Sequence, residues 1–133
     1  SNTKMKSFQI VAALLLITVA LSQARNSYFV FTDGVDEFTI KLTDPTNIQH
    51  ARDLITKATT ERPHIMGNVI KEAAFYNYEW NYQLNTTTIK FFDFAAEACD
   101  ASISYVDEHL AEVGGELLPG SKWCPWRSRL VRE

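Results

Sequence analysis

The side chains that most often carry out catalysis are few in this sequence, and they are widely spaced. Its three histidines, His50, His64 and His109, are scattered along the chain, and none belongs to an H-E-x-x-H zinc motif. The sequence also has no G-x-S-x-G nucleophile motif and no glycine-rich phosphate loop. We therefore predict no catalytic residue, no cofactor and no metal site, and we expect that the protein is not an enzyme.

Acidic side chains gather in two stretches. Asp33, Asp36 and Glu37 offer the oxygen ligands that calcium prefers, but without EF-hand spacing, so we interpret them as turn-forming residues. Residues 93–112 contain acids and no Lys or Arg. We interpret this second stretch as a solvated face, and an acidic patch for a basic partner is the alternative.

The two cysteines, Cys99 and Cys124, are the strongest covalent signal in the chain. An even pair in an oxidising compartment is typical of a disulfide, which in a loop of this length stabilises a small domain by roughly 3–4 kcal/mol. Two free thiols or half of a metal site are the alternatives. We predict the disulfide.

The prediction of an oxidising compartment depends on residues 5–24, which have the pattern of a secretory signal peptide. Lys6 is followed by an apolar run of about a dozen residues, shorter than the roughly 20 that a membrane-spanning helix needs. Ser22 and Ala24 then place small residues at the positions that a signal peptidase reads. We predict tag-derived or upstream residues at 1–4, a signal peptide at 5–24, and one secreted domain at 25–133 with no membrane span.

The charge balance limits the class of partner. The chain has 13 basic and 16 acidic residues, a formal net charge of −3. Nucleic acids and anionic membranes need a basic face, so we predict that neither is the main partner. An extracellular protein is the partner that we expect, and the oligomeric state stays open.

Local patterns in the first half of the domain predict strands and one helix. A short aromatic and β-branched run at 28–31, turn residues at 33–36 and alternating apolar residues at 38–42 predict a β-hairpin. Asp44-Pro45 is typical of a helix start, and the helical spacing that follows extends to Thr59 or Thr60. Residues 65–70 predict a strand, with Gly67 as a bulge.

In the second half of the domain, the spacing of the apolar residues changes from alternation to one in every three or four positions. Residues 78–84 and 88–92 predict a second hairpin across Asn85-Thr86-Thr87. Apolar residues recur every three or four positions from 93 to 113, which predicts the longest helix, ended by Gly114-Gly115. A last strand is predicted at 129–131. These elements indicate a small single α+β domain, with an antiparallel or mixed sheet packed against two helices and one disulfide.

Two segments are candidate binding loops. The first is the tail that the disulfide joins to the long helix, because a loop held by a disulfide and prolines loses little entropy on binding. Its candidate residues are Leu118, Pro119, Lys122, Trp123, Pro125, Trp126 and Arg127. The second is the loop that contains Arg62, Pro63 and His64. The alternative for the tail is that its tryptophans form core around the cystine.

Asn85-Thr86-Thr87 is an N-x-Thr sequon, so Asn85 is a candidate for N-glycosylation on the surface. A plain polar turn is the alternative.

Several motifs together resemble a family of small secreted domains that are labelled calmodulin-binding-protein-like. The resemblance is carried by the stretches at 80–84, 91–95, 99–102, 105–106, 109–110, 112–115, 118–120 and 123–126, and by 31–34, Phe38 and 41–45 near the start. It covers nearly all of the predicted mature chain. It implies this domain type and a secreted setting, and it brings no catalytic residue.

The favoured interpretation is a secreted, disulfide-stabilised binding module, in concrete form an inhibitor of an extracellular serine protease. One alternative is a secreted defence or venom component, toxin-like, that acts on a receptor, channel or membrane. Another is a small hydrolase or a carbohydrate-binding domain, in which the aromatic segment 76–82 stacks on a sugar.

Overall fold

The structure, a computed structural model, describes residues 27–133 and begins with a β-hairpin. β1 (Ser27–Thr32) and β2 (Glu37–Leu42) are antiparallel along their whole length. Asp33 closes the turn, because its Oδ1 accepts the backbone N–H groups of Val35 (3.0 Å) and Asp36 (2.9 Å). Alternate side chains of both strands are buried, which confirms the predicted hairpin.

The predicted signal peptide at residues 5–24 and residues 1–4 lie outside the described residues. Within residues 27–133, no helix has both the length and the apolar character needed to cross a membrane.

Helix α2 (Pro45–Thr56) begins where the sequence predicts. The Asp44 carboxylate accepts the N–H of Thr46 at 2.8 Å, and proline occupies the first turn. The helix ends at Thr56, before the predicted Thr59 or Thr60. Lys57 adopts a left-handed backbone conformation (φ 61°), which stops the helix.

β3 (His64–Ile70) is the central strand of the second sheet. β5 (Lys90–Phe92) pairs with its first half, β4 (Gln83–Leu84) with its end, and β8 (Lys122–Trp123) with its middle. The predicted hairpin between 78–84 and 88–92 is therefore wrong, since β4 and β5 each pair with β3.

Residues between β4 and β5 form the short 3₁₀ helix η2 (Thr86–Thr88). The N–H of Asn85 donates to the carbonyl of Asn68, whose own N–H donates to the Thr88 hydroxyl, both at 2.8 Å. These two hydrogen bonds satisfy the backbone of β3 at Asn68, between the part of β3 that pairs with β5 and the part that pairs with β4.

Gly67 does not form the predicted bulge, because it lies in regular pairing opposite Trp123. A glycine at this position leaves room for the neighbouring side chains. A Cβ there would lie 3.4 Å from the side chains of both Ile89 and Leu84.

The predicted strand at 78–84 is mostly wrong. The 3₁₀ helix η1 (Phe75–Asn77) and a turn occupy this region, and only Gln83–Leu84 is a strand. The buried Asn77 side chain decides this, because Oδ1 accepts the N–H of Thr39 (2.9 Å) and Nδ2 donates to the carbonyl of Tyr82 (3.3 Å).

The predicted long helix at 93–113 is also wrong. The segment contains η3 (Glu97–Cys99), the six-residue helix α3 (Ile103–Glu108) and η4 (Leu110–Glu112), with extended residues between η3 and α3. Ser102 caps α3 by accepting the N–H of Tyr105 at 3.2 Å. Cys99, Ile103, Val106 and Val113 are still buried, although the backbone that presents them is broken into short turns.

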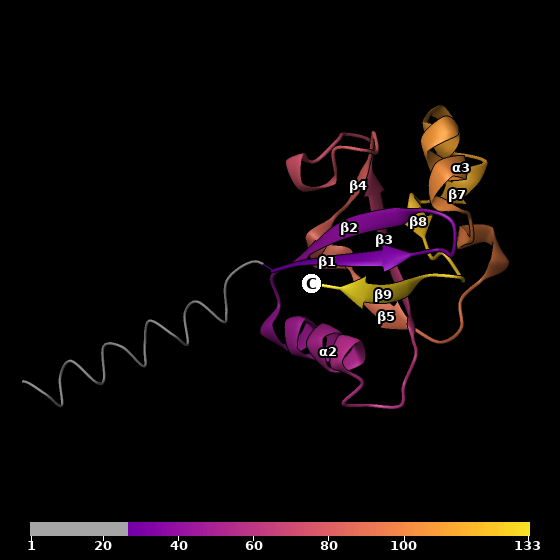
Figure 1. Ribbon diagram of the computed structural model, residues 1–133. Helices are drawn as coiled ribbons and strands as arrows, with labels where there is room; N and C mark the ends of the chain where they lie inside the picture. The colour runs from indigo at the N-terminus through magenta and orange to yellow at the C-terminus, as the bar shows by residue number, and fades with distance from the viewer. Residues whose placement is uncertain (1–26) are drawn as a thin grey trace, which may run out of the picture.

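The tail contains more regular structure than the sequence predicts. β6 (Val113–Gly114) pairs with β7 (Leu117–Pro119) in parallel, and β8 joins the second sheet. β9 (Arg129–Arg132) pairs with β1, which confirms the predicted last strand. In Figure 1, β9 lies beside β1 with α2 below them.

The core lies between the β1–β2 hairpin, β3 and the tail. The Trp123 ring is fully buried, with its centroid 5.2 Å from that of Phe38, 5.4 Å from that of Tyr82 and 5.8 Å from that of Phe31. The predicted α+β class, with mixed and antiparallel pairing, two helices and one disulfide, is confirmed.

Candidate functional site

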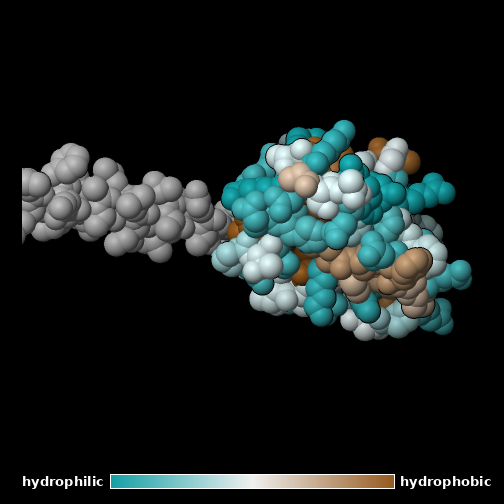
Figure 2. Space-filling model, turned by 90° about the horizontal axis from the view of Figure 1, so that it is seen from below, coloured by the Kyte–Doolittle hydropathy of each residue, from teal (hydrophilic) through white to brown (hydrophobic). Residues whose placement is uncertain are grey.

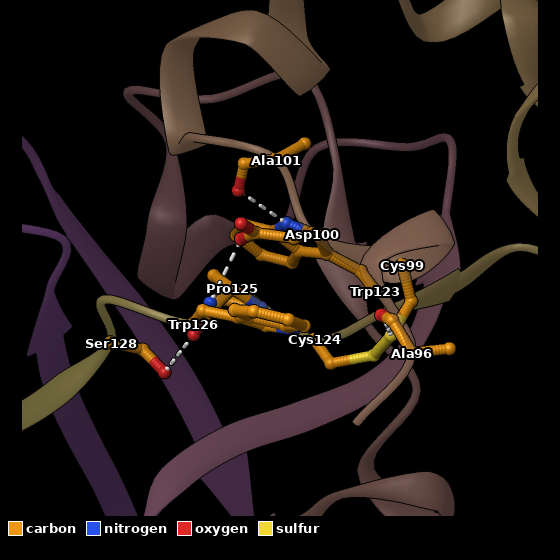
Figure 3. The surroundings of a disulfide bond; sticks show 9 residues. All are labelled: Ala96, Cys99, Asp100, Ala101, Trp123, Cys124, Pro125, Trp126 and Ser128. Atoms are coloured by element: carbon orange, nitrogen blue, oxygen red, sulfur yellow. Dashed lines mark hydrogen bonds between the residues drawn. A yellow bond between two sulfur atoms is a disulfide. The ribbon is translucent and has the colours of Figure 1, made fainter. Parts of the chain in front are cut away.

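A disulfide joins Cys99, at the end of η3, to Cys124 in the tail, as predicted. Figure 3 shows the bond and its surroundings. The N–H of Cys124 also donates to the carbonyl of Cys99 at 2.7 Å. The bridge starts from a 3₁₀ turn and not from a long helix, so that part of the prediction is wrong.

Hydrogen bonds on both sides of the bridge extend this attachment (Figure 3). The Trp123 indole Nε1 donates to the carbonyl of Ala101, and the backbone N–H of Trp126 donates to the Asp100 carboxylate, both at 2.9 Å. The tail is therefore held to residues 99–101 covalently and by polar contacts.

Burial divides the predicted tail loop into two sets. Leu118 and Trp123 are fully buried in the core and offer no contact surface, and Pro125 is buried as well. Pro119, Lys122, Trp126 and Arg127 are exposed. The alternative that the tryptophans form core thus holds for Trp123, whereas Trp126 keeps 37% of its surface exposed.

The second predicted loop lies beside the tail. In it Arg62 is exposed, Pro63 is buried and His64 is half-buried. His64 Nδ1 lies 2.9 Å from the carbonyl oxygen of Ser128 and 3.0 Å from the guanidinium of Arg129, which also donates to the carbonyl of Arg62. The fold therefore brings the two candidate loops together at the start of β3.

Where these loops meet, aromatic side chains surround a cavity of about 210 Å³, which we call the aromatic cleft. It is lined by His64, Phe92, Asp93, Phe94, Ala95 and Trp126. Figure 2, which views the molecule from below, shows an apolar patch within a mainly hydrophilic surface. The lining of the cleft is mainly apolar and contains one carboxylate, that of Asp93.

Phe94 is the cleft residue that sequence reasoning missed as a binding residue. Its side chain is 96% exposed, the most exposed of the large hydrophobic residues that the structure describes. The sequence places it in the predicted helix, where an isolated exposed phenylalanine has no special meaning. The sequence does place Phe94 outside the apolar stripe of the predicted helix, and this position indicates that its ring is exposed.

The cleft loop, residues 93–98, is fixed at both ends. β5 pairs with β3 on one side, and the disulfide at Cys99 follows on the other. The backbone N–H of Cys99 also donates to the carbonyl oxygen of Ala96 at 3.3 Å. The loop therefore presents Phe94 from a supported backbone.

Asp33 connects the first hairpin to this region. Its Oδ2 accepts the buried N–H of Ile103 at 2.9 Å, at the start of α3. Burial by itself would raise the pKa of Asp33, but the backbone N–H groups of Asp36, Ile103 and Val35 together outweigh it and hold the pKa below its usual value. The carboxylate therefore acts as a structural anion that joins two turns.

A second aromatic surface lies on the turn at 75–80, away from the cleft loop (Figure 1, pink beside β4). Phe75 and Tyr78 are 81% and 79% exposed, and the Tyr76 ring packs against Tyr28 with centroids 5.1 Å apart. Burial raises the pKa of Tyr76, with a smaller contribution from Tyr28. Of the aromatic segment that the sequence singles out at 76–82, Tyr76 and Tyr78 belong to this surface, whereas Tyr82 is fully buried in the core.

No group of three or more His, Cys, Asp or Glu side chains in residues 27–133 is arranged to hold a metal ion. The acids of the first turn have other partners. Asp33 accepts backbone N–H groups, and Glu37 pairs with the guanidinium of Arg132 at 3.0 Å.

Asn85 lies half-buried at the start of η2, where its Oδ1 accepts the N–H (3.2 Å) and the hydroxyl (2.9 Å) of Thr87. The side chain thus forms the polar turn that was one of the two interpretations. Its glycosylation stays a prediction.

Comparison with known proteins gives one match. The model of the family described as BP-74 N-terminal domain matches residues 25–133, and that description names no enzymatic activity. The comparisons with curated proteins and with solved structures found no match. The resemblance to calmodulin-binding-protein-like domains stays a prediction. Because the match spans most of the chain, the protein belongs to the BP-74 N-terminal domain family.

Proposed function

We propose that this domain is a secreted, disulfide-stabilised module that binds another extracellular protein through the aromatic cleft. The observation that carries the proposal is Phe94, which is 96% exposed beside an apolar cavity. Exposed apolar patches on folded domains are typical of interaction sites, and aromatic and arginine side chains dominate contact energies there. Trp126, which also lines the cleft, is 37% exposed.

The support of the cleft loop favours tight binding. A loop that is already fixed by a strand and a disulfide loses little conformational entropy when a partner binds it. The disulfide is also typical of a protein that folds in an oxidising compartment, which agrees with the predicted secretion.

Within this class, the partner that we propose is an extracellular serine protease with an apolar specificity pocket. Such a protease recognises one large side chain that enters its pocket, and an inhibitor presents that side chain on a rigid, exposed loop. Phe94 on the cleft loop has these properties. An apolar pocket, as in chymotrypsin, fits a phenylalanine better than the acidic pocket of trypsin does.

The test measures inhibition of chymotrypsin, trypsin and elastase by the protein purified from a secretory expression host. We expect inhibition of chymotrypsin, weakened at least about 30-fold by Phe94→Ala, the size of an interface hot spot. Phe94→Arg should move the inhibition towards trypsin. Tyr78→Ala is the matched control, because it removes another highly exposed aromatic ring outside the cleft.

Unchanged activity of all these proteases at micromolar excess would overturn the protease proposal. The broader proposal then depends on affinity capture from the native extracellular fluid. Capture of the same proteins by wild type and by Phe94→Ala would overturn binding at the cleft.

A further inference from the structure

A second site lies on the turn at 75–80, outside the aromatic cleft. We propose that this surface, which we call the aromatic shelf, binds a neutral hexopyranose unit of an oligosaccharide. The shelf consists of the exposed rings of Phe75 and Tyr78 and the half-buried ring of Tyr76. It shares no lining residue with the cleft.

The shelf is held in place before any ligand binds. Asn77 fixes the turn to β2 and to Tyr82 through both polar atoms of its side chain. The indole N–H of Trp80 donates to the carbonyl of Glu37 at 2.7 Å, which secures the far end of the turn. The backbone that carries the exposed rings therefore keeps its position without the help of a partner, and binding costs it little entropy.

Polar side chains of three elements surround a cavity of about 100 Å³ beside these rings. The cavity is lined by Val30, Glu37, Thr39, Tyr76, Asn77, Tyr78, Glu79 and Arg132. Glu37 and Arg132 bond each other at this cavity, and the Glu79 carboxylate and the hydroxyls of Thr39 and Tyr78 add acceptors and donors for hydroxyl groups. A purely apolar partner would leave these groups without water or hydrogen bonds.

A hexopyranose satisfies both halves of the site. Its ring has a flat face of C–H groups that can stack on an aromatic ring, and its edge carries hydroxyl groups. The small cavity receives that edge, while the exposed Tyr78 ring, which lines the cavity, covers the face. This combination of an apolar body and a polar tip matches the shelf better than an aliphatic side chain does.

The local charge favours a neutral sugar over an acidic one. Glu37 and Arg132 neutralise each other in an ion pair, and Glu79 adds one further negative charge. A uronate or a sulfated sugar would therefore meet net repulsion at the cavity.

Isothermal titration of the secreted protein with cellohexaose and with N-acetylchitohexaose tests the proposal. We expect one of these oligosaccharides to bind, and Tyr78→Ala to weaken its binding at least about tenfold. Phe94→Ala is the matched control and should bind the sugar as wild type does.

Absence of binding by both oligosaccharides at millimolar concentration would overturn the proposal. Equal binding by wild type and Tyr78→Ala would also overturn it. Because the shelf and the cleft share no lining residue, loss of sugar binding leaves protease inhibition unaffected, and the two proposals fail separately.

Discussion

The cleft loop at 93–98 and the turn at 75–80 present aromatic rings in similar ways and are anchored in different ways. Phe94 is 96% exposed on the first, and Tyr78 is 79% exposed on the second. A covalent bond at Cys99 follows the first, whereas the side-chain amide of Asn77 holds the second. A disulfide acts mainly by restricting the unfolded chain, and a hydrogen bond acts in the folded one.

This difference predicts that the disulfide contributes the larger share of stability. The chain-entropy relation gives about 3.5 kcal/mol for a bridge between cysteines 25 positions apart. The double variant Cys99→Ala, Cys124→Ala should therefore unfold at much lower urea concentration. A loss below about 1 kcal/mol would mean that the buried Trp123 and the polar contacts at 99–101 hold the tail without help.

Removal of the Asn77 side-chain amide should lower the unfolding free energy by less than removal of the disulfide does. Asn77→Ala leaves the N–H of Thr39 and the carbonyl of Tyr82 without their partner, which costs about 2 kcal/mol of unfolding free energy. Asn81→Ala is the matched control, since Asn81 is exposed and its side-chain amide bonds the Asp107 carboxylate. Urea unfolding measures both. Equal losses in the two variants would contradict the role assigned to Asn77.

Acid should separate the two anchors, because the buried Asp33 carboxylate bonds Ile103, close to the disulfide in sequence, whereas the turn at 75–80 is held by an amide. The pKa of Asp33 is lower in the folded state than in the unfolded state, so its stabilising contribution is complete above about pH 4 and is lost as the pH falls further. Asp33→Asn should flatten the pH dependence of stability below about pH 4. Asn77→Ala should keep the wild-type slope, since an amide does not titrate. Thermal unfolding from pH 2 to pH 7 measures both slopes.

The smallest effect on stability is expected from the exposed rings, the feature that the two regions share. Phe94→Ala and Tyr78→Ala remove rings that are largely in solvent, so each should change the unfolding free energy by less than about 0.5 kcal/mol. Equilibrium unfolding checks this. A loss above about 1.5 kcal/mol in either variant would show that its ring packs on the domain, and would remove the premise of the corresponding binding proposal.

Elements with strong local signals could be predicted from the sequence. The hairpin at 28–42 has alternation and a turn, and α2 has the Asp44 cap followed by proline. Both form much as predicted because neighbouring residues supply the hydrogen bonds and the backbone restraints. The disulfide was predictable for a different reason, since only two cysteines are present.

The two large errors fall where distant contacts override local periodicity. Residues 93–113 repeat apolar side chains at helical spacing, but residues 99–101 bond to the tail and interrupt the helix. Residues 78–84 alternate as a strand does, but Asn77 binds β2 and draws the segment into a turn. In both cases a polar group forms a hydrogen bond with a residue that is distant in the sequence.

The order of residues was sufficient to establish the α+β class, the covalent pair and the shortage of catalytic motifs, because these depend on composition and on near neighbours. Folding alone determined which exposed side chains share a surface. His64, Phe94 and Trp126 line one cleft, and the Phe94 ring is exposed there because the residue lies in a loop and not in the predicted helix. Such proximity arises from the pairing of β3 with distant strands, and spacing along a chain carries no information about it.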